Sequence, residues 1–568
     1  MAVLRSQVRR GAYYDSVVLM QLQRGLLALP GVLDAGAVMA TPANLELLEA
    51  SGLRTGDSAG PDDLLIVVRA ETDDAAEGAL AAVDGLLARR RATADAEFRP
   101  KSLEAAVRQL PEASWVLVSV PGRFAAGVAR DALRLGKNVF LYSDNVSLED
   151  EIALKHEASR LGLLVMGPDC GTAIIGGVGF GFANRVRRGP IGLVAASGTG
   201  LQAVTSAIHE LGGGVSQAIG TGGRDLHDEV GGATALEGLD VLRRDPATRV
   251  IVVVSKPPEP EVVARITAAA RRAAKPVVFD LIGEPVGGAA LGNLHFASSL
   301  YRAAELAVDL ARAETTPSED AADGAPRYLR ALFSGGTLAY EAVLALQHVL
   351  HPLRTNVPLR ASQRLEDPLH SVGHTVVDLG ADQFTVGRLH PMIDNDLRLR
   401  RLRQEAADPA TGVVLLDVVL GEGAHPDPAS ELAPAIAEAV RRKDLAVLAV
   451  VVGTDEDPQD RAAQIERLRA AGARVATRLD EALDAALRLL PAADVPWPQP
   501  VPLEVFARPA AINVGLEVFY ASVVAQGASA LHVDWRPPAG GDERLMGILR
   551  KMKATREGSG AAGRSPEE

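Results

Sequence analysis

The 568-residue sequence predicts an α/β protein built around parallel sheets. Short runs of Val, Ile and Leu alternate with segments of helical apolar spacing, which is the pattern of strands buried on both faces. Nearly half of the residues (47%) are apolar but only 4% are aromatic, as is typical of Ala-, Gly- and Val-rich α/β proteins. A chain of this length is too long for one core, so we expect several domains.

Composition also limits the partners and the chemistry. The net charge of −13 argues against nucleic acid or an anionic membrane as a partner. No apolar run approaches the length of a membrane span and no signal-peptide pattern is present, so we expect a cytoplasmic protein. The single cysteine, Cys170, excludes a disulfide framework and a cysteine-based metal site. We expect no metal site, and we expect Cys170 to be a small buried side chain.

The chain is organised around the stretch PIGLVAASGTGLQAVTSAIHELG. Residues 191–196 read as a buried strand and residues 201–211 as a helix. The turn between them consists of Ser197, Gly198, Thr199 and Gly200. A small-residue turn that opens a helix leaves backbone N–H groups free at the positive end of the helix dipole. The turn is therefore a candidate phosphate site.

The same pattern occurs a second time, which makes it an internal repeat. A strand at 329–333 leads into a second candidate phosphate turn, made of Ser334, Gly335, Gly336 and Thr337. Each turn is followed by a Gly-Arg motif with a histidine and then by the sequence DPAT. We expect two flavodoxin-like units whose helix N-termini face one point, with one phosphate bound between the two turns.

The Gly-Arg motifs supply the candidate catalytic residues. Arg224 and Arg388 are candidates for clamping phosphate or a substrate carboxylate in a bidentate manner. His227 and His390 are candidates for acid–base catalysis. The alternative for each of the four is a solvent-facing loop residue or a cap.

A third candidate region precedes the repeat, where the pattern from residue 103 becomes doubly wound. Ligands in such sheets bind outside the carboxyl ends of the strands. These ends predict a cleft for the substrate or for a CoA-type ligand, and its candidate residues are Pro121, Gly122, Asp144, Asn145, Pro168 and Asp169. The alternative is that Asp144 and Asn145 only cap a helix.

The domain boundaries follow from these patterns and from Pro/Ala-rich and acidic linkers. Residues 1–95 predict a small ferredoxin-like α+β domain, with strands at 2–8, 31–39 and 63–69, in a structural or partner-docking role. Residues 504–555 are too short for a core of their own, so we expect them to dock on another subunit or on this chain's own core. The predicted division is 1–95, 100–189, 190–313, 326–490, 504–555 and a disordered tail at 556–568, with linkers at 314–326 and 495–503.

The motifs GPDCGTAIIG, PIGLVAASGTG and GTGGRD resemble the α subunit of succinyl-CoA synthetase and the wider ADP-forming acyl-CoA synthetase superfamily. The second repeat is similar to the carboxyl-terminal domain of the β subunit of that enzyme. The signatures GGRDLHDEVGG and GADQFTVGRLHPMID resemble the FdrA family most closely, over roughly residues 1–490. The resemblance implies a Rossmann-like CoA-binding-type domain at 100–189, followed by two flavodoxin-like domains of the succinyl-CoA synthetase type.

The sequence departs from the synthetases in four places. After the strand KPVVFD no histidine occurs until His295, although the phosphohistidine of those enzymes belongs in that loop. Lys256 stands where they carry the glutamate that orients the phosphohistidine. No ATP-grasp domain is present, and the amino-terminal module replaces the Gly-rich loop that binds the CoA pyrophosphate. We therefore expect neither a phosphohistidine nor an ATP-driven ligase cycle in this chain alone.

The FdrA resemblance implies a transferase that uses phosphate. Proteins of this type are implicated as subunits of oxamate carbamoyltransferase, which converts oxalurate and phosphate to oxamate and carbamoyl phosphate. Phosphate would be a substrate, CoA is a possible ligand, and partner subunits encoded nearby are expected. Two alternatives remain open: an ADP-forming acyl-CoA synthetase whose ATP-grasp half is on another chain, and a non-catalytic scaffold or regulatory subunit.

Overall fold

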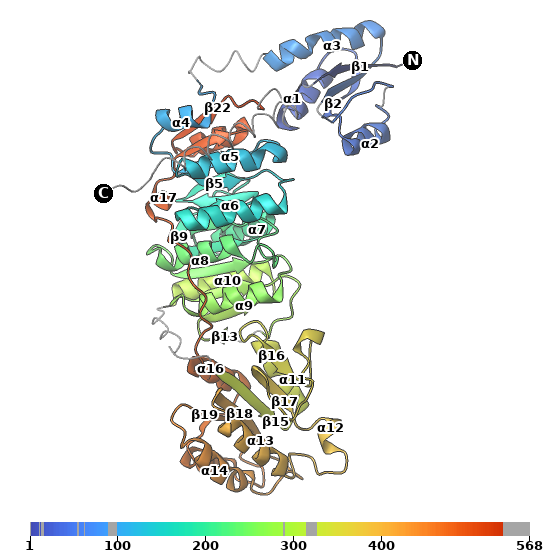
Figure 1. Cartoon of the computed structure of the whole chain (residues 1–568). Helices are drawn as coiled ribbons and strands as arrows, with labels where there is room; N and C mark the ends of the chain where they lie inside the picture. The colour runs from blue at the N-terminus through green and yellow to red at the C-terminus, as the bar shows by residue number, and fades with distance from the viewer. Residues whose placement is uncertain are drawn as a thin grey trace, which may run out of the picture. The chain divides into compact units, whose positions relative to one another are not determined.

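The computed structural model describes residues 2–10, 12, 16–53, 56–61, 63–88, 99–287, 290–313 and 327–537. The expected linker at 314–326 and the expected tail at 556–568 lie outside these residues. The chain forms two compact units, one made of Met1–Ala106 with His532–Glu568 and the other of Val107–Leu531. Figure 1 labels the helices and strands of both units.

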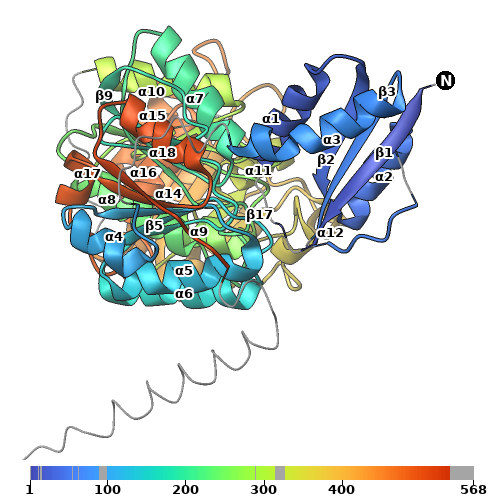
Figure 2. The ribbon, with the colours of Figure 1, turned by 90° about the horizontal axis from the view of Figure 1, so that it is seen from above.

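The amino-terminal unit contains a three-stranded antiparallel sheet in the order β1-β3-β2. Its elements are β1 (Val3–Arg9), α1 (Ser16–Leu27), β2 (Val32–Met39), α2 (Pro42–Ala50), β3 (Leu64–Ala70) and α3 (Asp73–Ala88). Apolar side chains of α1 and α3 cover one face of the sheet, and Leu48 of α2 packs on the other face (Figure 2). All three strands lie within two residues of their predicted positions. The clearest of the three patterns is that of β3, which begins with a continuous apolar run.

The second unit begins with most of a five-stranded sheet in the order β22-β21-β4-β5-β6; His532 and Val533 at the end of β22 and residues 103–106 belong to the first unit. Its elements are α4 (Leu103–Gln109), β4 (Trp115–Val118), α5 (Gly122–Arg134), β5 (Asn138–Leu141), α6 (Leu148–Leu161), β6 (Val165–Met166), α17 (Glu504–Ala507), β21 (Ala511–Val514), α18 (Glu517–Ala525) and β22 (Ala530–Val533). Strand β21 pairs in parallel with β4, with Ile512 opposite Val116. Phe519 and Val523 of α18 are buried in the core of the unit. The described part of the carboxyl-terminal segment, residues 504–537, therefore contributes to this chain's own core.

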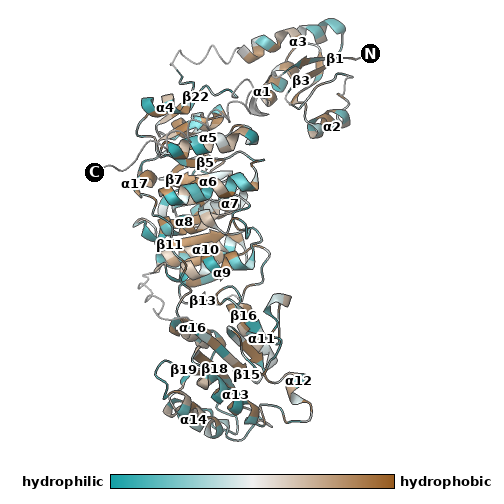
Figure 3. Cartoon of the chain, in the orientation of Figure 1, coloured by the Kyte–Doolittle hydropathy of each residue, from teal (hydrophilic) through white to brown (hydrophobic). Residues whose placement is uncertain are grey.

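An eight-stranded sheet follows in the order β13-β14-β12-β11-β9-β10-β7-β8. Its strands are β7 (Thr172–Ile175), β8 (Val178–Gly181), β9 (Arg188–Ala195), β10 (Val215–Gly220), β11 (Val250–Val254), β12 (Val277–Asp280), β13 (Ala290–Leu291) and β14 (Leu294–Ala297). Its helices are α7 (Gly198–Glu210), α8 (Ala233–Arg244), α9 (Pro260–Arg271) and α10 (Leu300–Arg312). The five strands from β14 to β10 are parallel. Figure 3 shows the contrast between brown strands and the teal outer faces of helices such as α6.

The third sheet is fully parallel and has the order β16-β17-β15-β18-β19-β20. Its strands are β15 (Tyr328–Phe333), β16 (Leu353–Thr355), β17 (His374–Asp378), β18 (Thr411–Val419), β19 (Ala446–Val452) and β20 (Arg474–Ala476). Its helices are α11 (Gly336–Leu346), α12 (Asp382–Thr385), α13 (Asp396–Ala407), α14 (Pro428–Ala439), α15 (Arg461–Ala470) and α16 (Leu479–Leu489), with a 3₁₀ turn at Ala361–Gln363.

The second and third sheets are two copies of one unit. The order β12-β11-β9-β10 of the second sheet corresponds to β19-β18-β15-β17 of the third. In both copies the aspartate of DPAT ends a helix and accepts a hydrogen bond from the N–H group two residues later, Asp245 in one and Asp408 in the other. Strand β16, which lies between α11 and β17 in the chain, has no counterpart between α7 and β10. The predicted fold class, an α/β protein with parallel sheets and a small amino-terminal domain, is confirmed.

Candidate functional site

The first turn lies between β9 and α7, as the sequence predicts. Ser197 is the N-cap of α7, and its hydroxyl oxygen accepts a hydrogen bond from the N–H group of Gly200. The first N–H group with an intrahelical partner is that of Leu201, which donates to the carbonyl oxygen of Ser197. The N–H groups of Gly198 and Thr199 come before it and are therefore free for an outside anion. Gly200 is buried, and a Cβ there would lie 3.2 Å from Val254 Cγ1. An added Cβ at Gly198 would have no contact closer than 3.5 Å.

Strand register identifies the neighbours of this turn. Ala195 lies opposite Val254 of β11 on one side and opposite Gly220 of β10 on the other. Ser197, Lys256 and Gly222 each follow these positions by two residues and therefore come to the same edge of the sheet. Lys256 is exposed. The structure thus places a cation beside the N-terminus of α7.

Thr172 contributes a buried polar atom to the same place. Its side chain is only 1% exposed, and its Oγ1 has no hydrogen-bond partner among the described residues. The same Oγ1 is the nearest atom, at 3.5 Å, to the position of a Cβ added to Gly198. Because a buried hydroxyl without a partner is costly, this atom favours a ligand or a water molecule at the helix N-terminus.

The loop between β6 and β7, part of the GPDC motif, approaches this edge from the first sheet. A Cβ on Gly222 would lie only 2.2 Å from the carbonyl oxygen of Pro168, so this position requires glycine, which also has a φ of +81°. The corresponding point on Gly223 lies 2.6 Å from Lys256 Nζ and 3.7 Å from Asp169 Oδ2. The structure therefore brings Pro168 and Asp169 of the predicted cleft to the loop after β10, at Gly222 and Gly223.

The remaining residues of the predicted cleft lie together at the edge of the first sheet. Pro121 is the N-cap of α5, and a Cβ on Gly122 would lie 2.1 Å from the carbonyl oxygen of Asp144 and 2.6 Å from that of Asn145. Such a close approach is possible only for glycine. Asn145 adopts the left-handed conformation, with a φ of +52°. Ser147, rather than Asp144 or Asn145, is the N-cap of α6.

Arg224 is part of an ion-pair cluster that joins the first and second sheets. Its Nε lies 2.8 Å from Glu151 Oε2, and its Nη2 donates to the carbonyl oxygen of Val146. Lys155 contacts Glu151 and Asp225, each at 2.8 Å, and all three side chains are at most 1% exposed. The cluster holds the GTGG loop in place, since Lys155 Nζ also donates to the carbonyl oxygen of Thr221 at 3.2 Å.

Of the four predicted catalytic residues, two are exposed, one from each copy of the repeat. His227 and Arg388 are exposed, and neither side chain has an ion pair within the described residues. They match the alternative interpretation of solvent-facing loop residues. Cys170, as expected, is buried, and burial raises the pKa of its thiol to about 12. His295 lies on β14, three strands or about 14 Å away from β9 across the sheet.

The second turn also connects a strand to a helix, but different side chains surround it. Ser334 is fully buried, its N–H group donates to Asp417 Oδ1 at 2.7 Å and its hydroxyl donates to Asp417 Oδ2 at 2.9 Å. Arg398, also buried, lies 3.2 Å from Asp417 Oδ1. A carboxylate of the chain itself therefore occupies the donors of Ser334. Met392 lies beside Gly335, and no described hydrogen bond or ion pair joins the two turns.

Two further groups surround the second turn. A Cβ on Gly336 would lie 2.9 Å from Asp378 Oδ2, and one on Gly380 would lie 2.8 Å from His390 Nε2 and 2.6 Å from the carbonyl oxygen of Ser334. Burial, together with the charge of Asp417, raises the pKa of Asp378. His390 is therefore near the turn, whereas Thr337 is exposed. Two carboxyl groups beside the N-terminus of α11 oppose the binding of phosphate there.

Sequence reasoning missed Thr172, Asp280 and the carboxyl groups of the second turn, and it noted Lys256 only as a departure from the synthetases. Burial raises the pKa of Asp280, whose Oδ2 is shielded from solvent and has no described hydrogen-bond partner. The available signal was position: Lys256 follows β11, the neighbour of β9, and Asp280 ends β12, the next strand of the sheet.

Comparison with known protein families gives matches for two parts of the chain. Residues 332–489 match the CoA-ligase family, and residues 1–102 match the family described as AllF, heavy metal-associated domain. The Escherichia coli protein YahF is 40% identical over 492 residues, which cover 82% of this chain and 94% of YahF. The α subunit of a Methanothermobacter thermautotrophicus succinate–CoA ligase is 28% identical over 143 residues, 25% of this chain and 47% of that subunit.

Residues 332–489, which hold most of the third sheet, match the CoA-ligase family, and a quarter of the chain is similar to the α subunit of succinate–CoA ligase. The chain belongs to the family of YahF, and its amino-terminal residues match the AllF-type domain. It spans only about half the length of the succinate–CoA ligase subunits that it matches.

Among solved structures, a dinucleotide-forming acetyl-coenzyme A synthetase from Ca. Korarchaeum cryptofilum, in complex with phosphate and ADP, aligns over 66% of this chain and 82% of its own. The identity is 16% and the TM-score is 0.28. A likeness at this level carries no argument about ligands. Among the described residues, no helix combines the length and the hydropathy needed to cross a membrane.

The residues of the amino-terminal module do not fit a heavy metal, although its family carries that description. Residues 1–102 contain neither cysteine nor histidine, the ligands that soft metals prefer. Within the described part of the chain, no three His, Cys, Asp or Glu side chains are grouped as metal binding requires. We therefore assign no metal chemistry to this module.

Proposed function

We propose that the chain is a subunit of an FdrA-type carbamoyl- or acyltransferase that uses inorganic phosphate, of the oxamate carbamoyltransferase type. The observation that supports this proposal best is the first turn. Free N–H groups at the start of α7, the exposed Lys256 and the unpartnered Thr172 hydroxyl converge there. Phosphate suits such a site because it accepts several hydrogen bonds and carries the opposite charge.

The proposed reaction is a phosphorolysis. A phosphate oxygen attacks the terminal carbamoyl carbon of oxalurate, the bond from that carbon to the inner nitrogen breaks, and the nitrogen takes up a proton to leave as oxamate. The N–H groups and Lys256 would stabilise the charge that develops on the phosphate and carbamoyl oxygens. Asp169 and Asp280, at the same edge, are the carboxyl groups available for proton transfer.

The roles of the remaining candidates follow from their positions. Arg224 would act as a positioning residue, because its contacts with Glu151 and Val146 hold the loop that faces the turn. The edge of the first sheet, from Pro121 to Asn145, would receive the organic part of the substrate. The proposed phosphate site includes only the first turn, since the hydroxyl of Ser334 in the second turn already donates to Asp417.

The test is phosphate-dependent cleavage of oxalurate by the chain, purified with and without its partner subunits. Gly198→Asp would place a carboxylate at the anion position, whereas Gly198→Ala adds the same Cβ without charge, in ordinary contact at 3.5 Å from Thr172. We expect the Asp variant to lose phosphate binding and carbamoyl phosphate formation, and the Ala variant to keep most of both. Equal activity in the two variants would contradict the proposal.

The matches to succinate–CoA ligases favour a second candidate, an ADP-forming acyl-CoA ligase with its ATP-grasp half on another chain. This candidate requires a phosphorylated histidine near the first turn, whereas His295 lies three strands away. Incubation with labelled ATP and an ATP-grasp partner distinguishes the two. Acid-labile, base-stable label on this chain would favour the ligase, and its absence together with oxalurate cleavage would favour the transferase.

A further inference from the structure

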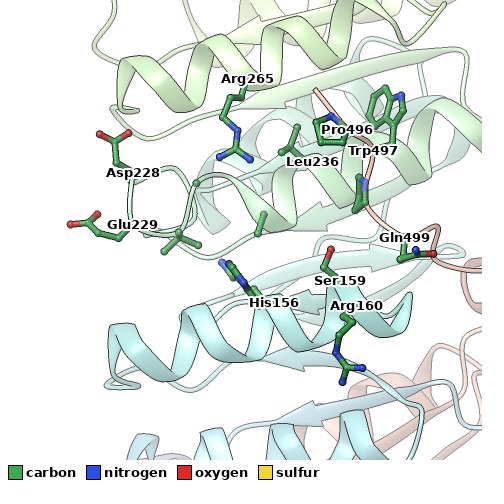
Figure 4. Close-up of a pocket in the computed structure, with 15 residues that line it drawn as sticks. His156, Ser159, Arg160, Asp228, Glu229, Leu236, Arg265, Pro496, Trp497 and Gln499 are labelled. Carbon is green, nitrogen blue, oxygen red and sulfur yellow. The ribbon is translucent and has the colours of Figure 1, made fainter. Parts of the chain in front are cut away.

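A hollow of about 630 Å³ shares none of its lining residues with the first turn or with the cleft residues of the first sheet. Three parts of the chain that are distant in sequence line it: α6, the segment from Asp228 into α8 with Arg265 of α9, and the proline-rich stretch 496–499 (Figure 4). Its volume is that of a typical small-molecule pocket. No step of the proposed reaction uses it.

The wall formed by the proline-rich stretch is held in place from below. The guanidinium of Arg243 lies 4.3 Å from the ring centroid of Trp497, and Arg244 donates to the carbonyl oxygen of Val501. Arg272 donates to the carbonyl oxygen of Val495 at 3.0 Å. Because three arginines of the second sheet's helices fix this stretch, the pocket exists before any ligand binds.

The polar groups that enter the pocket are suited to an anion. Arg265 and His156 point into the hollow from opposite sides, while Asp228 and Glu229 point away at its mouth (Figure 4). Within the described residues, the Arg265 side chain makes no hydrogen bond or ion pair. By contrast, Lys155 and Arg224 of the neighbouring cluster are both paired with carboxylates. An unpaired guanidinium in a concave site favours a carboxylate or a phosphate.

The remaining lining is apolar or aromatic. Leu236, Pro496, Pro498 and the half-buried Trp497 surround the space next to the cations. We propose that this pocket binds a small organic anion, whose charged group lies between Arg265 and His156 and whose apolar or planar body packs against Trp497. The site is separate from the proposed phosphate turn.

Fluorescence of Trp497 tests the proposal in the whole chain. The probe is 4-nitrobenzoate, because a nitroaromatic ring quenches an indole that it touches, and 4-nitrobenzamide is its uncharged control. The signal from Trp497 is the difference between the chain and Trp497→Phe, a variant that keeps an aromatic ring for Arg243. We expect saturable quenching by the anion and quenching at least tenfold weaker in affinity by the amide.

The matched variants are Arg265→Gln in the pocket and Arg441→Gln, an exposed arginine of the third sheet's region. Arg265 is exposed, so its replacement leaves the fold intact, and we expect it to weaken 4-nitrobenzoate binding about tenfold or more. Arg441→Gln should bind as the parent does. A second arm with 4-nitrophenyl phosphate shows whether phosphate is preferred to carboxylate. Lack of Trp497-dependent quenching by both anions, or equal binding in Arg265→Gln, would overturn the proposal.

Discussion

The two turns of the repeat differ in what neutralises their helix N-termini. In the first copy Val254 ends the neighbouring strand β11, and Lys256 follows two residues later at the same edge of the sheet. In the second copy the DPAT motif aligns Asp417 with Val254, and this carboxylate binds both the N–H group and the hydroxyl of Ser334. The donors of Ser334 are thus bound by a carboxylate of the chain itself, whereas no described hydrogen bond joins a carboxylate to the first turn.

This difference teaches that a duplicated motif does not imply a duplicated site. An aspartate in place of a valine on the adjacent strand gives Ser334 of the second turn a carboxylate partner within the chain. The buried Arg398 accompanies the exchange, because a buried carboxylate requires a partner. The four predictions below test this comparison.

The largest effect is expected at the second turn. Asp417→Ala would leave Arg398 buried without its partner and the N–H group of Ser334 without its acceptor. Loss of one member of a buried pair destabilises a protein by about 3–5 kcal/mol. Hydrogen exchange in the intact chain should show faster opening of β18 and α13. Glu422→Ala, an exposed change in the same region, is the control, and equal protection in the two variants would contradict the internal-anion interpretation.

The next prediction concerns the pH dependence of stability, which has opposite slopes in the two copies. In the first copy, burial raises the pKa of Glu237 to about 8 from 4.5. The folded state then binds one more proton than the unfolded state between these values, so stability falls as pH rises through this window, by about 1.4 kcal/mol per unit. In the second copy, burial lowers the pKa of His374 to about 3 from 6.5, so its contribution is complete above pH 6.5 and is lost as pH falls toward 3.

Local opening free energies from hydrogen exchange at pH 5, 6.5 and 8 separate these slopes in the whole chain. Glu237→Gln should remove the decline in α8 above pH 5 and leave β17 unchanged. His374→Gln should lower the stability of β17, because its Nδ1 accepts a hydrogen bond from the N–H group of Leu329. A decline in α8 that persists in Glu237→Gln would assign the slope to another group.

How far the sequence predicts these features depends on the range of the interaction. The strand–turn–helix pattern of both turns was predictable because apolar periodicity and small residues act locally. The contacts of Ser334 with Asp417 and of Gly222 with Pro168 were not, since they join residues 83 and 54 positions apart. Arg224 illustrates the same limit: its motif suggests a phosphate clamp, but its partner Glu151 lies on helix α6, 73 positions earlier in the chain.

A smaller effect is expected on phosphate affinity. Lys256→Ala removes the cation beside α7 and should weaken phosphate binding about tenfold. Ser334→Ala should leave phosphate affinity unchanged and lower only stability, because its hydroxyl serves Asp417. Isothermal titration calorimetry with inorganic phosphate measures both. A loss of affinity in Ser334→Ala equal to that in Lys256→Ala would restore the single site shared by both turns.

The smallest effect is expected for His227, which the Gly-Arg motif suggests as an acid–base group. Its side chain is exposed, whereas its backbone carbonyl accepts hydrogen bonds from the N–H groups of Val230 and Gly231 and so shapes the loop. His227→Ala keeps those backbone bonds and removes only a solvated imidazole. We expect the rate of oxalurate phosphorolysis to change less than twofold across pH 6 to 8. A large loss of kcat with unchanged phosphate affinity would instead mean that the loop brings His227 to the substrate during turnover, and His390→Ala would then show whether the second copy takes part in the same way.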